Sequence, residues 1–133
     1  MLCKGFAARC AVLVASAALE ALRSGRSDME KMRLEYRDRR NVIVEGFNSM
    51  GLHCFKPEGA FYVFPNITST GLSSQDFAVK LLQAKRVAVV PGNAFGSCGE
   101  GYVRCSYATS LEEIRTAMDR IEEFLGELKA EKA

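Results

Sequence analysis

The chain has 133 residues, of which 48% are hydrophobic and 26% are charged, and its formal net charge is +2. These values are typical of a folded domain of a soluble protein, and we treat residues 1–133 as a single domain. The small net charge, with no basic cluster interleaved with aromatic residues, argues against a nucleic-acid-binding protein.

Two helices are expected in the first part of the chain. The first covers about residues 7–22 and stops at Ser24-Gly25, because glycine commonly ends a helix. Its apolar run is too short to cross a membrane, and we interpret it as a buried, alanine-rich helix rather than a signal peptide. The second begins at Ser27 or Asp28 and ends at Gly51. Its predicted core-facing side, with the methionines as core filler, holds Met29, Met32, Tyr36, Ile43 and Phe47.

Three strands and two further helices are expected after Gly51. The strands cover residues 59–64, 87–90 and 102–107, since these runs are apolar or alternating and are bounded by turn signals. A helix begins at Ser73 and turns Phe77, Leu81 and Leu82 inward. The last helix begins with a capping box of Ser110 and Glu113. Its apolar stripe is Ile114, Met118, Ile121 and Leu125.

This order of elements predicts an α/β fold, a two-layer α+β sandwich with helices packed on one side of a three-stranded sheet. Tyr62 and Phe64 on the first strand are either site residues or packing residues between the sheet and the helices, and packing is the favoured interpretation. On the last strand, Val103, Cys105 and Tyr107 alternate with Tyr102, Arg104 and Ser106. If the first set faces the core, Arg104 points away from it on a rigid element, where a guanidinium is suited to bind a carboxylate or phosphate. The spacing alone favours the alternative, a solvated arginine on a half-exposed strand.

The glycine-rich loop before this strand does not have the spacing of a phosphate cradle, and a strand follows it where such a cradle needs a helix. Its glycines are interpreted as turn residues. The five cysteines form no C-x-x-C pair, and their odd number favours reduced thiols in a cytoplasmic protein. A metal site of His53, Cys54 and Cys98 is disfavoured because the spacing matches no zinc pattern.

Several motifs, taken in order, resemble the C-terminal part of class I aminotransferases. They are AALEALRSG, EYRDRRNVIVEGF, KPEGAFYVFPNI and PGNAFGSCGEGYVRCSYATS, and the likeness runs from about residue 17 to residue 128, with residues 1–16 divergent. These relatives are pyridoxal-phosphate enzymes of fold type I, of the aspartate or aromatic type. The resemblance implies their small-domain fold. It also implies that Arg104 binds the α-carboxylate of the substrate and that Asn93 and Phe95 approach it.

The same resemblance implies that part of the enzyme lies outside this chain. The family's cofactor-bearing lysine sits in an S-x-S-K-like segment upstream, and no lysine here has that context: Lys4, Lys31, Lys56, Lys80, Lys85, Lys129 and Lys132. We therefore expect pyridoxal phosphate only in the complete enzyme, with no catalytic, cofactor-binding or metal-binding residue in this chain. The expected partners are an amino acid or 2-oxo acid substrate and a cofactor-binding large domain or homodimer partner, with no nucleic acid and no membrane.

Three functions are compatible with these features. The favoured one is the substrate-binding C-terminal part of an aminotransferase, which transfers an amino group between an amino acid and a 2-oxo acid and is not competent alone. The others are a non-catalytic module that binds carboxylates through Arg104 and an assembly fragment that pairs with another chain through apolar surface. The sequence does not identify the amino acid that the complete enzyme uses.

Overall fold

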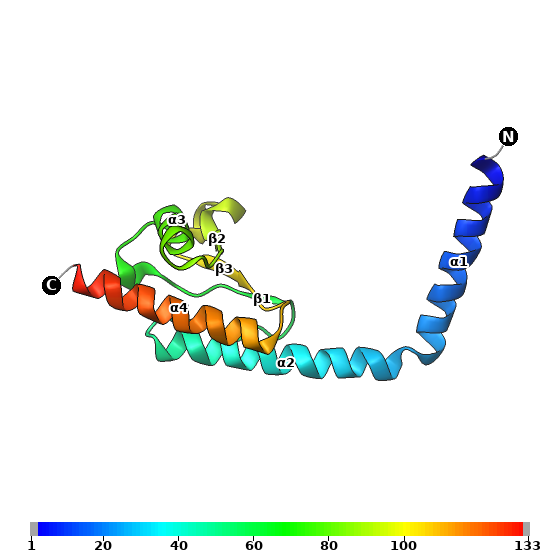
Figure 1. Ribbon diagram of the computed structural model, residues 1–133, viewed down its shortest axis with the longest axis horizontal. Coiled ribbons are helices and arrows are strands. Elements are labelled where there is room, and N and C mark those ends of the chain that lie inside the picture. The colour runs from blue at the N-terminus through cyan, green and yellow to red at the C-terminus, as the bar shows by residue number, and fades with distance from the viewer. Residues whose placement is uncertain (1–2, 132–133) are drawn as a thin grey trace. The chain divides into compact units, whose positions relative to one another are not determined.

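A computed structural model describes residues 3–131, with side chains from residue 11 onward (Figure 1). The described chain divides into two compact units, the first ending at Glu35 and the second beginning at Tyr36. In the part that is described, four α-helices accompany a three-stranded antiparallel sheet, which confirms the predicted α/β class. None of the helices between residues 3 and 131 combines the length and apolarity needed to cross a membrane.

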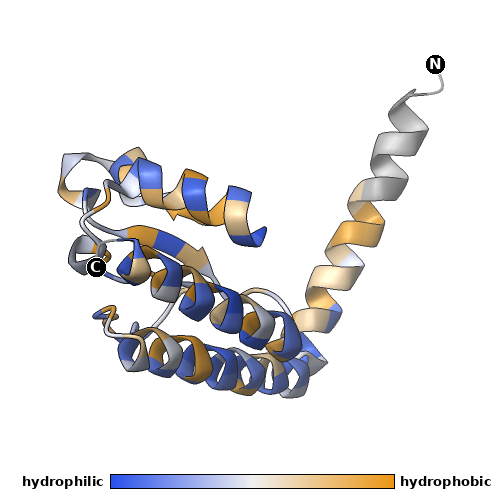
Figure 2. Ribbon diagram, turned by 60° about the vertical axis from the view of Figure 1, so that its left-hand side comes forward, coloured by the Kyte–Doolittle hydropathy of each residue, from blue (hydrophilic) through white to orange (hydrophobic). Residues whose placement is uncertain are grey.

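The first unit consists of α1 (Cys3–Ser24) and the first part of α2 (Arg26–Ser49), joined at Gly25. A Cβ atom at Gly25 would lie 2.5 Å from the carbonyl oxygen of Ala21, so this joint requires glycine. The prediction of a buried first helix is wrong, because residues 11–24 are all exposed. This unit contains no third element that could cover the apolar part of α1 (Figure 2).

The prediction that the methionines of α2 fill the core is also wrong. Met29 and Met32 are 56% and 55% exposed, whereas Ile43 and Phe47 are buried. All four share one helix, but only the second pair belongs to the unit that contains the sheet and the other helices. The helical spacing therefore identified a face of α2 correctly, although only its C-terminal part is covered.

The sheet has the order β1-β3-β2, with β1 (Tyr62–Val63) and β2 (Val90–Pro91) both antiparallel to β3 (Val103–Ser106). The two outer strands are shorter than predicted. Ala60 has a φ of +71°, which interrupts extended backbone just before β1. The second strand begins at Val90 rather than Val87, since β2 pairs with β3 only through Val90 and Pro91.

The core lies between one face of this sheet and the helices. Val63, Val103 and Cys105 from the strands meet Ile43 and Phe47 of α2 and the apolar stripe of α4 (Leu111–Ala130). The predicted burial of that stripe is confirmed for Ile114, Met118, Ile121 and Leu125. In α3 (Ser74–Lys85), Phe77 and Leu81 are buried as predicted, but Leu82 is 46% exposed because it lies on the next face of the helix.

Three kinds of contact fix α3 and α4. The predicted caps are confirmed, because the Ser73 hydroxyl accepts from the Asp76 amide at 3.1 Å and the Ser110 hydroxyl from the Glu113 amide at 3.2 Å. Phe77 and Phe124 meet edge to face with centroids 5.5 Å apart. Lys85 pairs with Glu127 at 2.6 Å and Glu123 at 3.1 Å, and these hydrogen bonds raise its pKa, Glu127 most.

Candidate functional site

The alternation of β3 places Arg104 on the face of the sheet opposite the core. Val103, Cys105 and the following Tyr107 are buried, whereas Arg104 is half-buried and Ser106 exposed. This confirms the predicted orientation of the strand. The guanidinium is therefore carried by the central strand of the sheet, the most constrained of the three.

Two aromatic rings flank the Arg104 guanidinium. Its Cζ atom lies 4.3 Å from the ring centroid of Phe95 and 5.4 Å from that of Tyr62. Both distances are within the range of cation–π attraction. The sequence analysis favoured a packing role for Tyr62 over a site role, but the ring of Tyr62 contacts the arginine.

The Arg104 guanidinium has no hydrogen-bond acceptor and no carboxylate partner among residues 3–131. Other arginines differ in this respect. Arg33 is held by both carboxylate oxygens of Glu30, and Arg40 donates to the carbonyl of Pro57 at 3.0 Å. The N–H edge of Arg104 is therefore available for a planar anion, which a guanidinium binds in a two-point manner.

Phe95 reaches the arginine from a tight loop that contains the short 3-10 helices η2 (Gly92–Phe95) and η3 (Ser97–Gly99). Two glycines make this loop possible. A Cβ atom on Gly92 would lie 2.1 Å from the carbonyl oxygen of Gly99, and one on Gly99 would lie 2.1 Å from that of Gly92. The interpretation of these glycines as turn residues agrees with this close approach of the two backbone segments.

Glu100 connects the loop to the beginning of α3, a contact that the sequence analysis missed. Its carboxylate accepts from the backbone amide of Ser74 at 2.8 Å and from the side-chain amide of Asn93 at 2.7 Å. The buried Ser74 hydroxyl accepts in turn from the Gly101 amide at 2.9 Å. Asn93, expected to approach a substrate, is thus engaged within the loop. An acidic residue whose partner is 26 positions away has no local sequence signal.

The two buried thiols of the second unit, Cys54 and Cys105, are unreactive near neutral pH. Burial raises the pKa of Cys54 to about 11, and burial together with the nearby Cys54 raises that of Cys105. Both are therefore neutral near pH 7, while Cys98 is exposed. Across residues 3–131, no three His, Cys, Asp or Glu side chains converge as a metal site would require.

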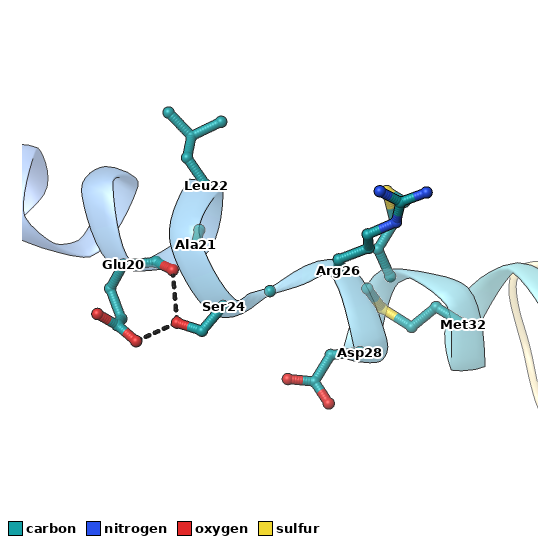
Figure 3. A pocket seen from close by; sticks show the side chains of 9 residues that line it. Glu20, Ala21, Leu22, Ser24, Arg26, Asp28 and Met32 are labelled. Atoms are coloured by element: carbon teal, nitrogen blue, oxygen red, sulfur yellow. Dashed lines mark hydrogen bonds between the residues drawn. The ribbon is translucent and has the colours of Figure 1, made fainter.

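A concave region lies in the first unit, at the joint of α1 and α2 (Figure 3). Its lining includes Leu22, Met29 and Met32 beside Arg26 and Asp28. The Ser24 hydroxyl donates to the backbone carbonyl of Glu20 at 2.9 Å and also to the Glu20 carboxylate. None of the predicted site residues lines this hollow.

The residues around Arg104 do not form a site for pyridoxal phosphate. They offer a guanidinium and two aromatic rings, whereas the cofactor needs a lysine to carry it and polar groups for its ring and phosphate. Among the described lysines, Lys85 is bound to Glu123 and Glu127, and Lys31 pairs with Asp28.

Comparison with known proteins identifies the family to which this chain belongs. The family described as aminotransferase class I and II matches residues 5–121. Aromatic-amino-acid aminotransferase 2 of Thermococcus litoralis and aspartate aminotransferase of Pyrococcus abyssi are each 53% identical over 115 residues. These residues make up 85% of this chain and 30% of each relative.

A solved structure gives the same result for the fold. The aromatic aminotransferase from Pyrococcus horikoshii matches with a TM-score of 0.82 and 51% identity, over 85% of this chain and 31% of that protein. The chain belongs to the class I and II aminotransferases. Its likeness is to the pyridoxal-phosphate enzymes of the aspartate and aromatic type, as the motifs predicted, and it spans about 30% of the length of these curated relatives.

Proposed function

We propose that this chain is the substrate-binding C-terminal part of an aminotransferase and that Arg104 binds the α-carboxylate of the amino acid or 2-oxo acid. The observation that carries the proposal is the state of Arg104, which is fixed between two rings on the central strand with no acidic partner in residues 3–131. A planar carboxylate matches the two N–H groups on one edge of a guanidinium. The same group occurs in every amino acid and every 2-oxo acid.

In this role the chain contributes binding and orientation. A two-point salt bridge fixes both the position and the rotation of the substrate carboxylate, so that its α-carbon faces the reacting group of the enzyme. The rings of Phe95 and Tyr62 cover the guanidinium and lower its exposure to water. A salt bridge shielded from water is stronger than one on an open surface.

The remaining machinery belongs to the part of the enzyme outside this chain. Pyridoxal phosphate, when bound there, supplies the carbon acidity and the amino-group transfer. A large domain or a second subunit would hold it, and this chain would supply the carboxylate-binding arginine. On this proposal the isolated chain does not transaminate.

A chimera tests the proposal. The matching C-terminal segment of the Pyrococcus horikoshii aromatic aminotransferase would be replaced by this chain, and transamination of L-phenylalanine with a 2-oxo acid would be measured. We expect the chimera to be active and Arg104→Ala to raise KM and lower kcat together, with kcat/KM reduced at least a hundredfold. Loss of a charged hydrogen-bonded contact of a few kcal/mol corresponds to that factor.

Two further variants sharpen the result. Arg104→Lys keeps the charge but loses the two-point geometry, so it should recover only part of kcat/KM. Arg115→Ala removes an exposed arginine from α4 and serves as the matched control, which should leave the kinetics unchanged. An Arg104→Ala chimera with the same kinetics as the parent chimera would refute the assignment.

A further inference from the structure

The two rings beside Arg104 come from different parts of the unit. Tyr62 lies on β1 and pairs with Ser106, so on the outer face of the sheet it is the diagonal neighbour of Arg104 on β3. Phe95 ends η2 in the loop between β2 and β3. Arg104 is therefore contacted by one ring from a neighbouring strand and by another from a loop.

The rings of Tyr62 and Phe95 are also connected through a third ring, that of Phe64. Phe64 meets Tyr62 edge to face at 5.9 Å and Phe95 at 5.8 Å between centroids. Phe64 thus links the ring of Tyr62 on β1 to that of Phe95 in the loop, and the guanidinium lies against both of these rings. Such contacts are favourable and restrict the rings, even though Phe95 is 52% exposed.

Aromatic rings differ from a carboxylate in what they do to an arginine. The negative face of a ring attracts the cation but accepts no N–H group in the plane of the guanidinium. Rings can therefore restrain the side chain, which otherwise has considerable rotamer freedom, without occupying the donors that bind a substrate. A glutamate in the same place would restrain Arg104 but would compete with the substrate.

The position of Phe95 depends in turn on the loop. The loop is closed by the contact between Gly92 and Gly99 and by the Gly96 amide, which donates to the carbonyl of Asn93 at 3.2 Å. Its other end is held by Glu100, which accepts from Ser74 and Asn93. The loop and β1 together determine where the guanidinium lies.

We propose that Tyr62 and Phe95 are positioning residues for the aminotransferase reaction, holding the Arg104 guanidinium between their rings so that it meets the substrate carboxylate already oriented. This inference rests on the proposed function of Arg104. Neither ring contributes a proton or a charge to the reaction. Their effect is to reduce the ordering that substrate binding would otherwise require.

The test uses the same chimera with Tyr62→Leu and Phe95→Leu, which remove the rings and keep apolar side chains. A lost cation–π contact of about 0.5–2 kcal/mol predicts a two- to thirtyfold rise in KM for L-phenylalanine, with kcat changed much less. The conservative variants Tyr62→Phe and Phe95→Tyr keep a ring and should restore KM. Phe55→Leu is the matched control, since Phe55 is 76% exposed, and should leave KM unchanged.

A spectroscopic measurement on the 133-residue chain gives a readout independent of turnover. Stacking on Phe95 should shift the Arg104 side-chain proton resonances upfield, and Phe95→Leu should return them toward the values of the exposed arginines. The inference fails if Arg104→Ala impairs the chimera while both leucine variants keep the parent KM, or if the ring-preserving variants do not restore it. Normal kinetics for Arg104→Ala would instead refute the proposed function itself.

Discussion

The two ends of α2 show how differently one kind of sequence pattern can be used. Both carry apolar residues at helical spacing, but Met29 and Met32 are exposed, whereas Ile43 and Phe47 form part of the core. The first pair belongs to the unit that contains only α1 and the start of α2, and the second to the unit with the sheet. Apolar spacing thus identifies which face of a helix is apolar. Whether that face is buried depends on whether another element packs against it.

The contrast continues in α1, where Val12, Leu13 and Val14 are all more than 60% exposed. In α4 the polar and apolar residues are segregated, and each apolar position of the stripe is covered (Figure 2). Apolar surface of the α1 kind is typical of regions that associate with other protein surfaces. The buried core residues, in contrast, all belong to the second unit.

The largest expected difference between the two units is the cost of truncating a leucine. Leu81 is fully buried and Leu22 is 87% exposed. Leu81→Ala should lower the free energy of unfolding by roughly 2–5 kcal/mol, whereas Leu22→Ala should change it by less than about 0.5 kcal/mol. Urea denaturation followed by tyrosine fluorescence reports the second unit alone, because all four tyrosines lie between Tyr36 and Tyr107. Equal effects of the two variants would contradict the contrast.

A smaller effect is expected from the buried Cys54 thiol at high pH. Burial raises its pKa from 9.0 to about 11. The folded state holds the Cys54 proton more tightly than the unfolded chain does. The stability contributed by this thiol is therefore fully present below pH 9, and up to about 3 kcal/mol of it is lost as the pH rises toward 11. Cys54→Ala should flatten this part of the pH profile in urea denaturation followed by far-UV circular dichroism. Cys98→Ala, at an exposed thiol, should leave the profile unchanged.

The smallest difference concerns two serines in unlike helical positions. Ser110 caps α4, where its hydroxyl accepts from the Glu113 amide, so Ser110→Ala should cost about 1 kcal/mol. Ser24 donates back to Glu20 at an exposed helix end, and Ser24→Ala should stay within about 0.5 kcal/mol. Thermal denaturation of the two variants side by side measures the difference. A larger loss for Ser24→Ala would show that the first unit is stabilised more than its exposure indicates.

Much of the second unit could be predicted from the sequence because its signals are local. The caps at Ser73 and Ser110 and the stripe of α4 depend on neighbours within one or two turns. The strand limits were less accurate, since a strand exists only where its partner pairs, and β1 and β2 pair with β3 over two residues each. The exposure of α1 could not be predicted because helical spacing does not show whether a covering element is present.

The candidate site was predicted in the same uneven way. The alternation of β3 predicted the outward orientation of Arg104, and the family motif singled it out as a candidate binding residue. The contact with Tyr62 depends on the register of β1 against β3, which no short motif encodes. Asn93 and Phe95 were grouped by their loop, but the fold separates them, with Asn93 bonded to Glu100 and Phe95 placed against Arg104.

The double use of the Glu100 carboxylate has a consequence for anyone who transplants this loop into another protein. Residues 92–101 are not self-sufficient, because the amide and hydroxyl of Ser74 supply contacts from a different segment. A graft of the loop and β3 alone would carry Arg104 and Phe95 but leave Glu100 without the Ser74 amide. The minimum transferable unit therefore includes the first turn of α3, so a graft needs two segments of chain.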